Sequence, residues 1–257
     1  MTTYGMIGDV EVHLDSGHIA VAEIKRPPHN YFDAALIASL ADAFEALDAD
    51  SRCRAIVLCS EGKNFCAGAQ LSGESKAGGA AVLYDQAVRL FATRTPVVAA
   101  IQGAAVGGGL GLALMPDFRV AAPEARFTAN FARLGFHQGF GLSVTLPALV
   151  GNQRAMELLY TGRRVNGEEA LKLGLCDRLV AGDVLRATAA EFAREIAASA
   201  PLAVDSIRET LRGDLAEKIR FATVRENAEQ ERLRKSRDFK EGLRAMAERR
   251  TPDFEGR

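Results

Sequence analysis

The sequence predicts an α/β fold, because short apolar strands alternate with helical segments in its first half and helices dominate the second. Two alternating runs, Val10–Leu14 and Ile19–Ile24, flank the turn "DSG" and predict a β-hairpin. The apolar runs Ala55–Ser60 and Pro96–Ile101 are too short for stable helices, so they predict buried strands. Between the hairpin and these strands, apolar residues recur at helical spacing over Phe32–Leu47.

The remaining elements follow from the same periodicities. A helix is expected from about Ala80 to Ala92, and short strands at Phe118–Ala122 and Arg126–Thr128. From about Ser143 onward the pattern is helical. The segment Pro201–Arg250 mixes acidic and basic residues, as a solvated helix face does, so its charges are given no catalytic meaning.

Composition excludes several classes of protein. The 257 residues carry a formal net charge of −1, so no nucleic-acid partner is expected. No apolar run reaches the roughly 18 residues of a membrane span, and no signal peptide is recognisable. The cysteines form no CxxC pair, which predicts neither a metal site nor a disulfide framework. A cytoplasmic protein without membrane contact is the simplest expectation.

A glycine-rich stretch, "GAAVGGGLGLAL" from Gly103 to Leu114, follows the second buried strand. Glycine inside an element costs roughly 0.5–1 kcal/mol relative to alanine, so the stretch needs an explanation. A helix over Leu110–Met115 would leave its first N–H groups unpaired, which makes the preceding loop a candidate anion site. The spacing matches neither a P-loop nor a dinucleotide fingerprint. Close helix packing through small residues is the alternative explanation.

A second loop, "NFCAGAQL" (Asn64–Leu71), decides between these explanations. Together with "VGGGLGLAL", "RPPHN", "PDFRVAAPEARF" and "EGLRAMAERRTPDFEG", it resembles the motifs of the crotonase superfamily, the enoyl-CoA hydratase/isomerase family, over essentially the whole chain. The resemblance implies a crotonase spiral of ββα units over residues 1–195 and a C-terminal helical trimerisation region over residues 196–257. It also implies a homotrimer or a dimer of trimers.

The same resemblance implies an acyl-CoA thioester substrate and a place in fatty acid metabolism. Coenzyme A enters as part of the substrate, so no separate cofactor is expected. By motif position, the backbone N–H groups of Ala69 and Gly108 form an oxyanion hole for the thioester carbonyl. The residues expected to contact the coenzyme A moiety are Arg26, His29, Cys66, Ala67, Gln70 and Arg249. For Arg249 an exposed helix charge is the alternative, and for Cys66 a packing role.

The chain departs from the family where acids are expected. Typical hydratases carry two glutamates, at positions that hold Gly111 and Phe131 here, and a third acid position aligns with about Gly139. Hydration needs a base that activates water and an acid that protonates carbon, so the two-carboxylate route is not expected. His137 lies in the loop that presents catalytic groups in the family and is predicted to transfer protons. Tyr84, on the helix that lines the acyl pocket in the family, is the second catalytic candidate.

These departures favour isomerase- or decarboxylase-like chemistry through a thioester enolate. The pattern "TANF…GF…GFG" also resembles decarboxylating crotonase homologues. Two alternatives stay open. The empty acid positions suit a non-catalytic acyl-CoA-binding protein, and the lone histidine suits a histidine-dependent hydrolase of a thioester or β-diketone.

Overall fold

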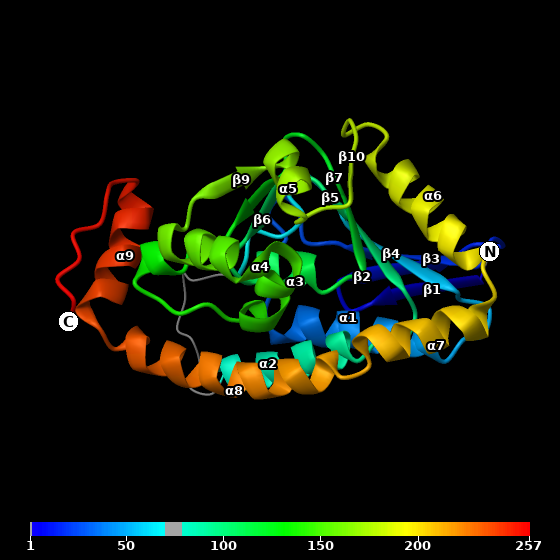
Figure 1. Ribbon diagram of the computed structural model, residues 1–257, viewed down its shortest axis with the longest axis horizontal. Helices are drawn as coiled ribbons and strands as arrows, with labels where there is room; N and C mark the ends of the chain where they lie inside the picture. Colours follow the sequence, from blue (N-terminus) through cyan, green and yellow to red (C-terminus); the bar gives the residue numbers. More distant parts are fainter. Residues whose placement is uncertain (1, 70–78) are drawn as a thin grey trace.

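The main β-sheet forms the centre of the protein (Figure 1). The structure, a computed structural model, describes residues 2–69 and 79–257. Within these residues the sheet has the strand order β1-β2-β3-β4-β5-β7-β10. Its strands are β1 (Thr2–Ile7), β2 (Val10–Leu14), β3 (Ile19–Ile24), β4 (Ala55–Ser60), β5 (Val97–Ile101), β7 (Phe118–Ala121) and β10 (Arg178–Leu179).

The sheet is mixed, and its centre is parallel. β2 pairs with β1 and β3 in antiparallel register, whereas the pairs from β3 through β4, β5 and β7 to β10 are parallel. Every residue of β4 and β5 is buried, as expected for parallel strands covered on both faces. A second, smaller sheet has the order β6-β8-β9. Its strands are β6 (Ala104–Val106), β8 (Arg126–Thr128) and β9 (Arg164–Asn166).

Helices cover both faces of the main sheet. One face packs on α1 and α2, and this core also takes in α3; the other face packs on α6. The side chain of Asp33 caps α1 by accepting a hydrogen bond from the N–H of Leu36 at 2.9 Å. The helices are α1 (Ala34–Asp48), α2 (Gly79–Phe91), α3 (Gly108–Leu114), the 3-10 turn η1 (Ala132–Leu134), α4 (Leu142–Thr161), α5 (Gly167–Leu173), α6 (Leu185–Ala197), α7 (Pro201–Arg212), α8 (Leu215–Arg234) and α9 (Arg237–Glu248).

The predicted α/β class is confirmed, and the main predicted strands and helices are present. The hairpin strands and β4 have the predicted bounds. Four strands were not predicted, namely β1, β6, β9 and β10. β6 lies inside the glycine-rich stretch, where small residues hide the strand pattern. β9 and β10 are too short to show a periodicity.

The C-terminal helices run along one edge of the molecule and end beside η1 (Figure 1). The predicted division at residues 195 and 196 falls in the last turn of α6, and it stays a prediction. α7 has no buried residue of its own. Arg208 and Arg212 attach it to the core by binding the carboxylate of Asp117 at 3.0 and 2.7 Å. No helix in the described part of the chain is long and apolar enough to cross a membrane.

The attachment of α7 gives a first prediction. Burial lowers the pKa of Arg212, and its charge is balanced by Asp117. We expect Asp117→Asn to lower the free energy of unfolding by about 3 kcal/mol and to expose α7 to limited proteolysis. Asp214→Asn is the control, because the Asp214–Lys218 ion pair is exposed and contributes little. Equal urea midpoints for the two variants would contradict this role of Asp117.

Candidate active site

Two loops that are distant in sequence lie backbone to backbone. The N–H of Cys66 donates to the carbonyl of Ala104 at 2.9 Å, and the N–H of Val106 donates to the carbonyl of Cys66 at 3.1 Å. A Cβ atom at Gly109 would lie 2.2 Å from the Cys66 carbonyl oxygen, and one at Gly68 would lie 2.7 Å from that of Val106. Only glycine permits this approach, so the glycine-rich stretch is needed where the loops meet.

Ala69 and Gly108 both lie at this junction, where Phe32 contacts Ala69 through its backbone and Gly108 through its ring. The N–H of Phe32 donates to the carbonyl of Gly68 at 3.0 Å, and Phe32 forms a parallel bridge with Ala69. The Phe32 ring lies on Gly108, where a Cβ atom would be 2.4 Å from its Cζ. Gly108 is the first residue of α3, so no preceding turn of the helix can accept from its N–H. Ala69 is exposed and Gly108 is partly exposed, which leaves both open to a ligand.

The early loop that carries Arg26 and His29 is tied to the same junction. The carbonyl of His29 accepts from the N–H of Ala67 at 2.9 Å, and its Nδ1 lies 3.1 Å from Nδ2 of Asn64. Because the amide nitrogen is a donor, His29 accepts at Nδ1, and in the neutral ring its Nε2 carries the proton. The His29 side chain is exposed, so this donor faces outward.

The Arg26 side chain is engaged by its own loop. Its guanidinium binds the carboxylates of Asp9 at 2.6 Å and Asp33 at 2.9 Å. Burial lowers the pKa of Arg26, but the hydrogen bonds to Asp9 and Asp33 outweigh this and leave the pKa above its ordinary value. Arg26 therefore fixes the loop against the start of α1, and its contact with any ligand would compete with two carboxylates.

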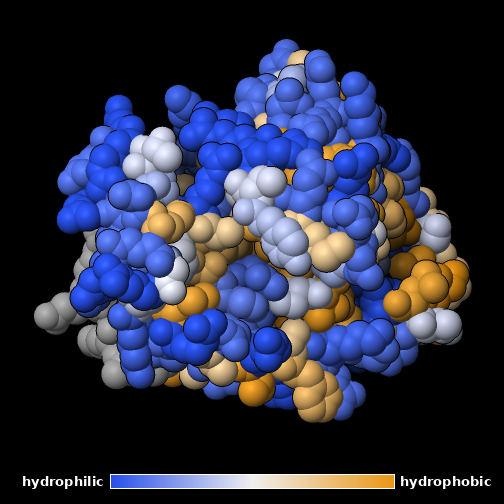
Figure 2. All heavy atoms as spheres, turned by 60° about the vertical axis from the view of Figure 1, so that its left-hand side comes forward, coloured by the Kyte–Doolittle hydropathy of each residue, from blue (hydrophilic) through white to orange (hydrophobic). Residues whose placement is uncertain are grey.

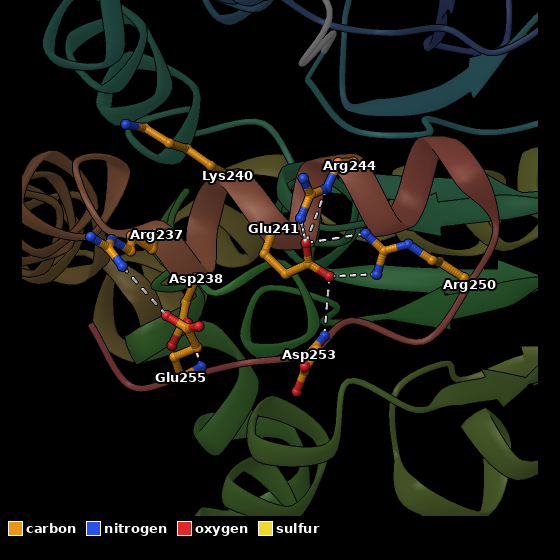
Figure 3. A pocket seen from close by; sticks show the side chains of 8 residues that line it. All are labelled: Arg237, Asp238, Lys240, Glu241, Arg244, Arg250, Asp253 and Glu255. Atoms are coloured by element: carbon orange, nitrogen blue, oxygen red, sulfur yellow. Dashed lines mark hydrogen bonds and ion pairs between the residues drawn. The ribbon is translucent and has the colours of Figure 1, made fainter.

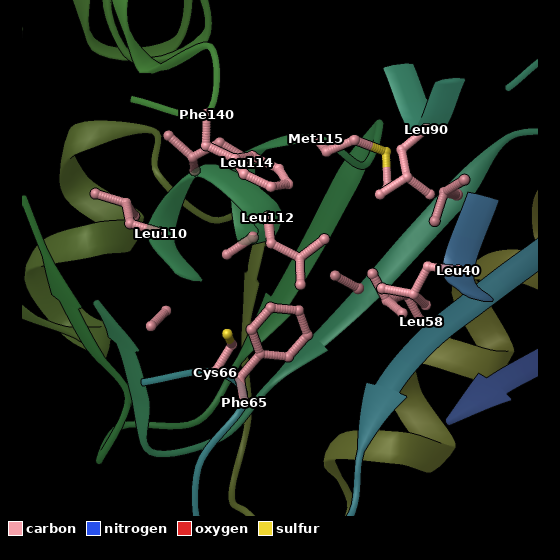
Figure 4. Packing of buried hydrophobic residues seen from close by; sticks show 14 of the residues in the cluster. Leu40, Leu58, Phe65, Cys66, Leu90, Leu110, Leu112, Leu114, Met115 and Phe140 are labelled. Atoms are coloured by element: carbon pink, nitrogen blue, oxygen red, sulfur yellow. The ribbon is translucent and has the colours of Figure 1, made fainter. Parts of the chain in front are cut away.

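The Cys66 side chain is fully buried among apolar residues, beside Phe65 and below α3 (Figure 4). Burial raises the pKa of the Cys66 thiol to about 12. The thiol is therefore protonated at neutral pH and packs as an apolar group. The Cys66 backbone is also engaged, since its N–H donates to Ala104 and its carbonyl accepts from Val106, so its predicted contact to coenzyme A stays a prediction.

Two of the predicted coenzyme A contacts, Arg249 and Gln70, are not among the residues that the structure places at the junction. Arg249 is exposed and ends α9 in the left-handed conformation, with φ of 55°. Gln70 lies outside the described residues, and its predicted contact stays a prediction.

The face around α9 is largely hydrophilic (Figure 2). It carries a hollow of about 670 Å³ in which Glu241 binds Arg244 and Arg250 (Figure 3). Arg249 is not among the residues that line this hollow.

The three positions where an acid is absent are filled by aromatic side chains or lie against them. A Cβ atom at Gly111 would lie 2.8 Å from Cβ of Phe140, so Phe140 occupies the space that a longer side chain would need. Phe131 is buried, and its Cζ lies 3.9 Å from the position of a Cβ at Gly107. A Cβ at Gly139 would lie 2.1 Å from the hydroxyl oxygen of Tyr84. In place of carboxylates, this side of the junction presents rings.

The loop between η1 and α4 brings His137 close to Tyr84, which lies on α2 and packs against Gly139 of that loop. His137 is half-buried in the loop between η1 and α4, and its Nδ1 lies 2.8 Å from the carbonyl oxygen of Gln138. A carbonyl only accepts, so Nδ1 carries the proton and Nε2 is an acceptor in the neutral ring. Tyr84 is buried and donates its hydroxyl proton to Oε1 of Gln230 at 2.8 Å. Burial raises the pKa of Tyr84, so the hydroxyl keeps its proton.

Two buried residues at this site were not predicted, Glu226 and Gln230 of α8. The sequence predicts a solvated helix face for the segment that contains them, and for these two buried residues that prediction is wrong. Together with Ile219 and Thr223 they form the buried face of α8. Because polar and apolar residues share this face, no hydrophobic periodicity marks it in the sequence.

Comparison with known proteins identifies the family. A family model described as enoyl-CoA hydratase/isomerase matches residues 15–257. The chain belongs to the enoyl-CoA hydratase/isomerase family. As a member, it is 36% identical to an enoyl-CoA isomerase/hydratase of Zymoseptoria tritici, over 94% of this chain and 85% of that protein. It is 34% identical to a carnitinyl-CoA dehydratase of Proteus mirabilis, over 96% of this chain and 98% of that protein.

Solved structures give the same answer for the fold of this family member. The crystal structure of an enoyl-CoA hydratase/isomerase from Pseudoalteromonas atlantica superposes with a TM-score of 0.87. The two chains are 31% identical, and the match covers 96% of this chain and 100% of the other. The predicted crotonase fold is therefore confirmed. Family membership supports an enzyme that acts on an acyl-CoA with lyase or isomerase activity.

The buried thiols give the second prediction. Burial raises the pKa of Cys53, Cys59 and Cys66 to about 12 and that of Cys176 to about 11. Because the thiolate is the reactive form, we expect no alkylation of the native chain by iodoacetamide between pH 7 and 9. Mass spectrometry should show four alkylated cysteines after denaturation. Rapid native alkylation of Cys66 would contradict a packing role for this thiol.

Proposed function

We propose that this protein isomerises the double bond of an enoyl-CoA through a thioester enolate. The observation that carries the proposal is the replacement of all three acid positions. Gly111 and Gly139 have no side chain, Phe131 cannot ionise, and the adjacent space holds Phe140 and Tyr84. Hydration needs two positioned proton-transfer groups and a water molecule, whereas isomerisation needs one group that takes a proton and returns it.

The oxyanion hole is the part of the site that we assign to the backbone. In this proposal the N–H groups of Ala69 and Gly108 donate to the thioester carbonyl oxygen, which becomes negative in the enolate. The glycine contacts between the two loops support this assignment, because they hold both donors at one junction. Donors fixed before the reaction need no reorganisation, and loss of one such donor typically costs about 3–4 kcal/mol of transition-state stabilisation.

His137 is the proton carrier in this proposal. Its Nε2, unprotonated in the neutral ring, removes a proton from the carbon next to the thioester carbonyl, and the electron pair moves into the enolate. The imidazolium then returns the proton to the far end of the conjugated system, which shifts the double bond. The proton count is unchanged overall, so no second acid is needed. Tyr84 is assigned to holding the loop, because its hydroxyl proton is directed at Gln230.

The coenzyme A arm is placed along the early loop and the Cys66–Ala69 loop. The exposed residue His29, through its Nε2–H, and the carbonyl of Ala67 are the polar groups that we assign to it. The Cys66 backbone is paired with Ala104 and Val106, so Cys66 is assigned to supporting this loop. Arg26 acts mainly by fixing this loop through its two carboxylate partners. Arg249 and Gln70 remain proposed contacts to the coenzyme A moiety.

Decarboxylation of an enoyl-CoA with a distal carboxylate, whose double bond conjugates the carbanion to the thioester, is the second candidate. The observation that favours it is the ring lining: Phe32, Phe131 and Phe140 are all at least nine-tenths buried beside the junction. Apolar rings desolvate a carboxylate, which favours its loss as carbon dioxide, and the electron pair left behind enters the enolate. His137, as the imidazolium, would then donate the proton.

We also propose that the chain assembles as a homotrimer or a dimer of trimers through its C-terminal helices. The support is a set of exposed large apolar side chains on α7 and α8, which a monomer would leave in water. They are Leu202, Ile207, Leu211, Phe221 and Val224, each more than half exposed.

The test is turnover on a panel of thioesters followed by chromatography and mass spectrometry. The panel holds a 3-enoyl-CoA, crotonyl-CoA, 3-methylglutaconyl-CoA and a β-diketone. We expect conversion of the 3-enoyl-CoA at unchanged mass and at least about a 100-fold loss of kcat in His137→Ala. His13→Ala is the matched control, since His13 is exposed on the hairpin and pairs with Glu11.

Each other outcome has a defined meaning. Loss of carbon dioxide from 3-methylglutaconyl-CoA would favour the decarboxylase, and hydrolysis of the β-diketone would favour the hydrolase. Water addition to crotonyl-CoA as the main activity would contradict the proposal. Binding of the panel without any conversion would leave an acyl-CoA-binding protein.

A further inference from the structure

The segment from His137 to Gly141 carries the proposed proton donor and acceptor but has no regular structure of its own. Phe140 and Gly141 both adopt left-handed backbone, with φ of 59° and 74°. Phenylalanine rarely adopts this conformation, so the surrounding contacts must hold it. α8 supplies those contacts.

Glu226 holds one end of the segment. Its carboxylate accepts from the N–H of Gly141 at 2.9 Å and from the N–H of Ser143 at 3.0 Å. Gly141 is the N-cap of α4 and offers no side chain to satisfy these groups. A carboxylate from another helix therefore does what an N-cap side chain normally does, and its charge suits the positive end of the α4 dipole. Glu226 is 1% exposed, so these bonds are formed away from water.

Gln230 holds the other end, one helical turn further along α8. Its Nε2 donates to the carbonyl of His137 at 3.0 Å, and its Oε1 accepts from the hydroxyl of Tyr84 at 2.8 Å. The carbonyl of His137 can only accept, so the amide nitrogen of Gln230 must face it and the amide oxygen faces Tyr84. A Cβ at Gly139 would lie 2.5 Å from Nε2 of Gln230, so the absence of a side chain at Gly139 allows the amide to approach the loop this closely.

We infer that Glu226 and Gln230 are positioning residues that fix His137 and Phe140 relative to the oxyanion loops. Gln230 fixes the backbone from which the His137 ring projects. Glu226 fixes the residue that follows Phe140, whose ring packs on Phe32 with centroids 5.4 Å apart. Phe32 in turn lies on Gly108, so the position of Phe140 is coupled to the oxyanion loop through packed side chains. The inference rests on the proposed function, in which His137 moves the proton.

The experiment compares Gln230→Met with Thr223→Val in the full-length chain. Met fills a similar volume but removes both hydrogen bonds of the amide. Thr223 lies on the same buried face of α8, and its hydroxyl bonds only to carbonyls of that helix, so its loss is the matched control. For Gln230→Met we expect kcat to fall by about tenfold to 100-fold with KM changed less than twofold, because a small displacement of a catalytic group slows the reaction.

Hydrogen exchange provides a readout that does not depend on turnover. Amides of residues 139–143 should exchange faster in Gln230→Met than in wild type, and at wild-type rates in Thr223→Val. If Gln230→Met does not fold, Tyr84→Phe removes only the hydroxyl that bonds to Gln230, and it should show the same kcat loss in milder form. Glu226→Gln should also accelerate exchange, because an amide nitrogen, itself a donor, would replace the oxygen that accepts from one of the two N–H groups.

The outcomes separate this inference from the proposed function. Wild-type turnover with a Gln230→Met kcat within twofold of that of Thr223→Val would overturn the inference and leave the proposed function standing. Wild-type protein that converts no thioester on the panel would overturn the proposed function, and the inference with it. A kcat loss in Gln230→Met at unchanged KM, with faster loop exchange, supports both.

Discussion

The contact on which the site depends is the approach of two backbones without side chains between them. Gly109 lies against the carbonyl of Cys66, and Gly68 lies against the carbonyl of Val106, at separations that no Cβ atom would permit. The hydrogen bonds between the two strands of backbone then hold Ala69 near the start of α3. Glycine loses more conformational entropy on folding than other residues do. In return, these glycines allow the two loops to approach each other this closely.

Aromatic rings give this member of the enoyl-CoA hydratase/isomerase family its individual character. Phe140 fills the space beside Gly111, and its ring packs on Phe32 and Phe91 with centroids 5.4 and 6.2 Å away. Gly111 carries no proton-transfer group, and the apolar ring beside it leaves less room for water, so the two features act in the same direction. Our proposal therefore uses the backbone N–H groups of Ala69 and Gly108 and the imidazole of His137.

Much of the fold could be predicted from the sequence, because β4, β5 and α1 are long enough to show their periodicities. The family motifs supplied the candidate oxyanion residues and the missing acids. The hydrogen bonds from α8 to the loop between His137 and Ser143 could not be predicted. Glu226 and Gln230 lie in a charged helix, and their partners in the loop include backbone atoms 85 and 93 residues away in sequence. Nothing in the local pattern distinguishes a polar residue that turns inward from one that faces water.

The most direct test of the central claim is the carbonyl resonance of a bound, unreactive thioester. Butyryl-CoA with carbon-13 at the thioester carbonyl would be added to the protein, and its resonance compared with that of the free ligand. Two backbone donors polarise the carbonyl and withdraw electron density from its carbon. We predict a clear downfield shift on binding. A saturated complex in which the carbonyl resonates at its free position would contradict an oxyanion hole at Ala69 and Gly108.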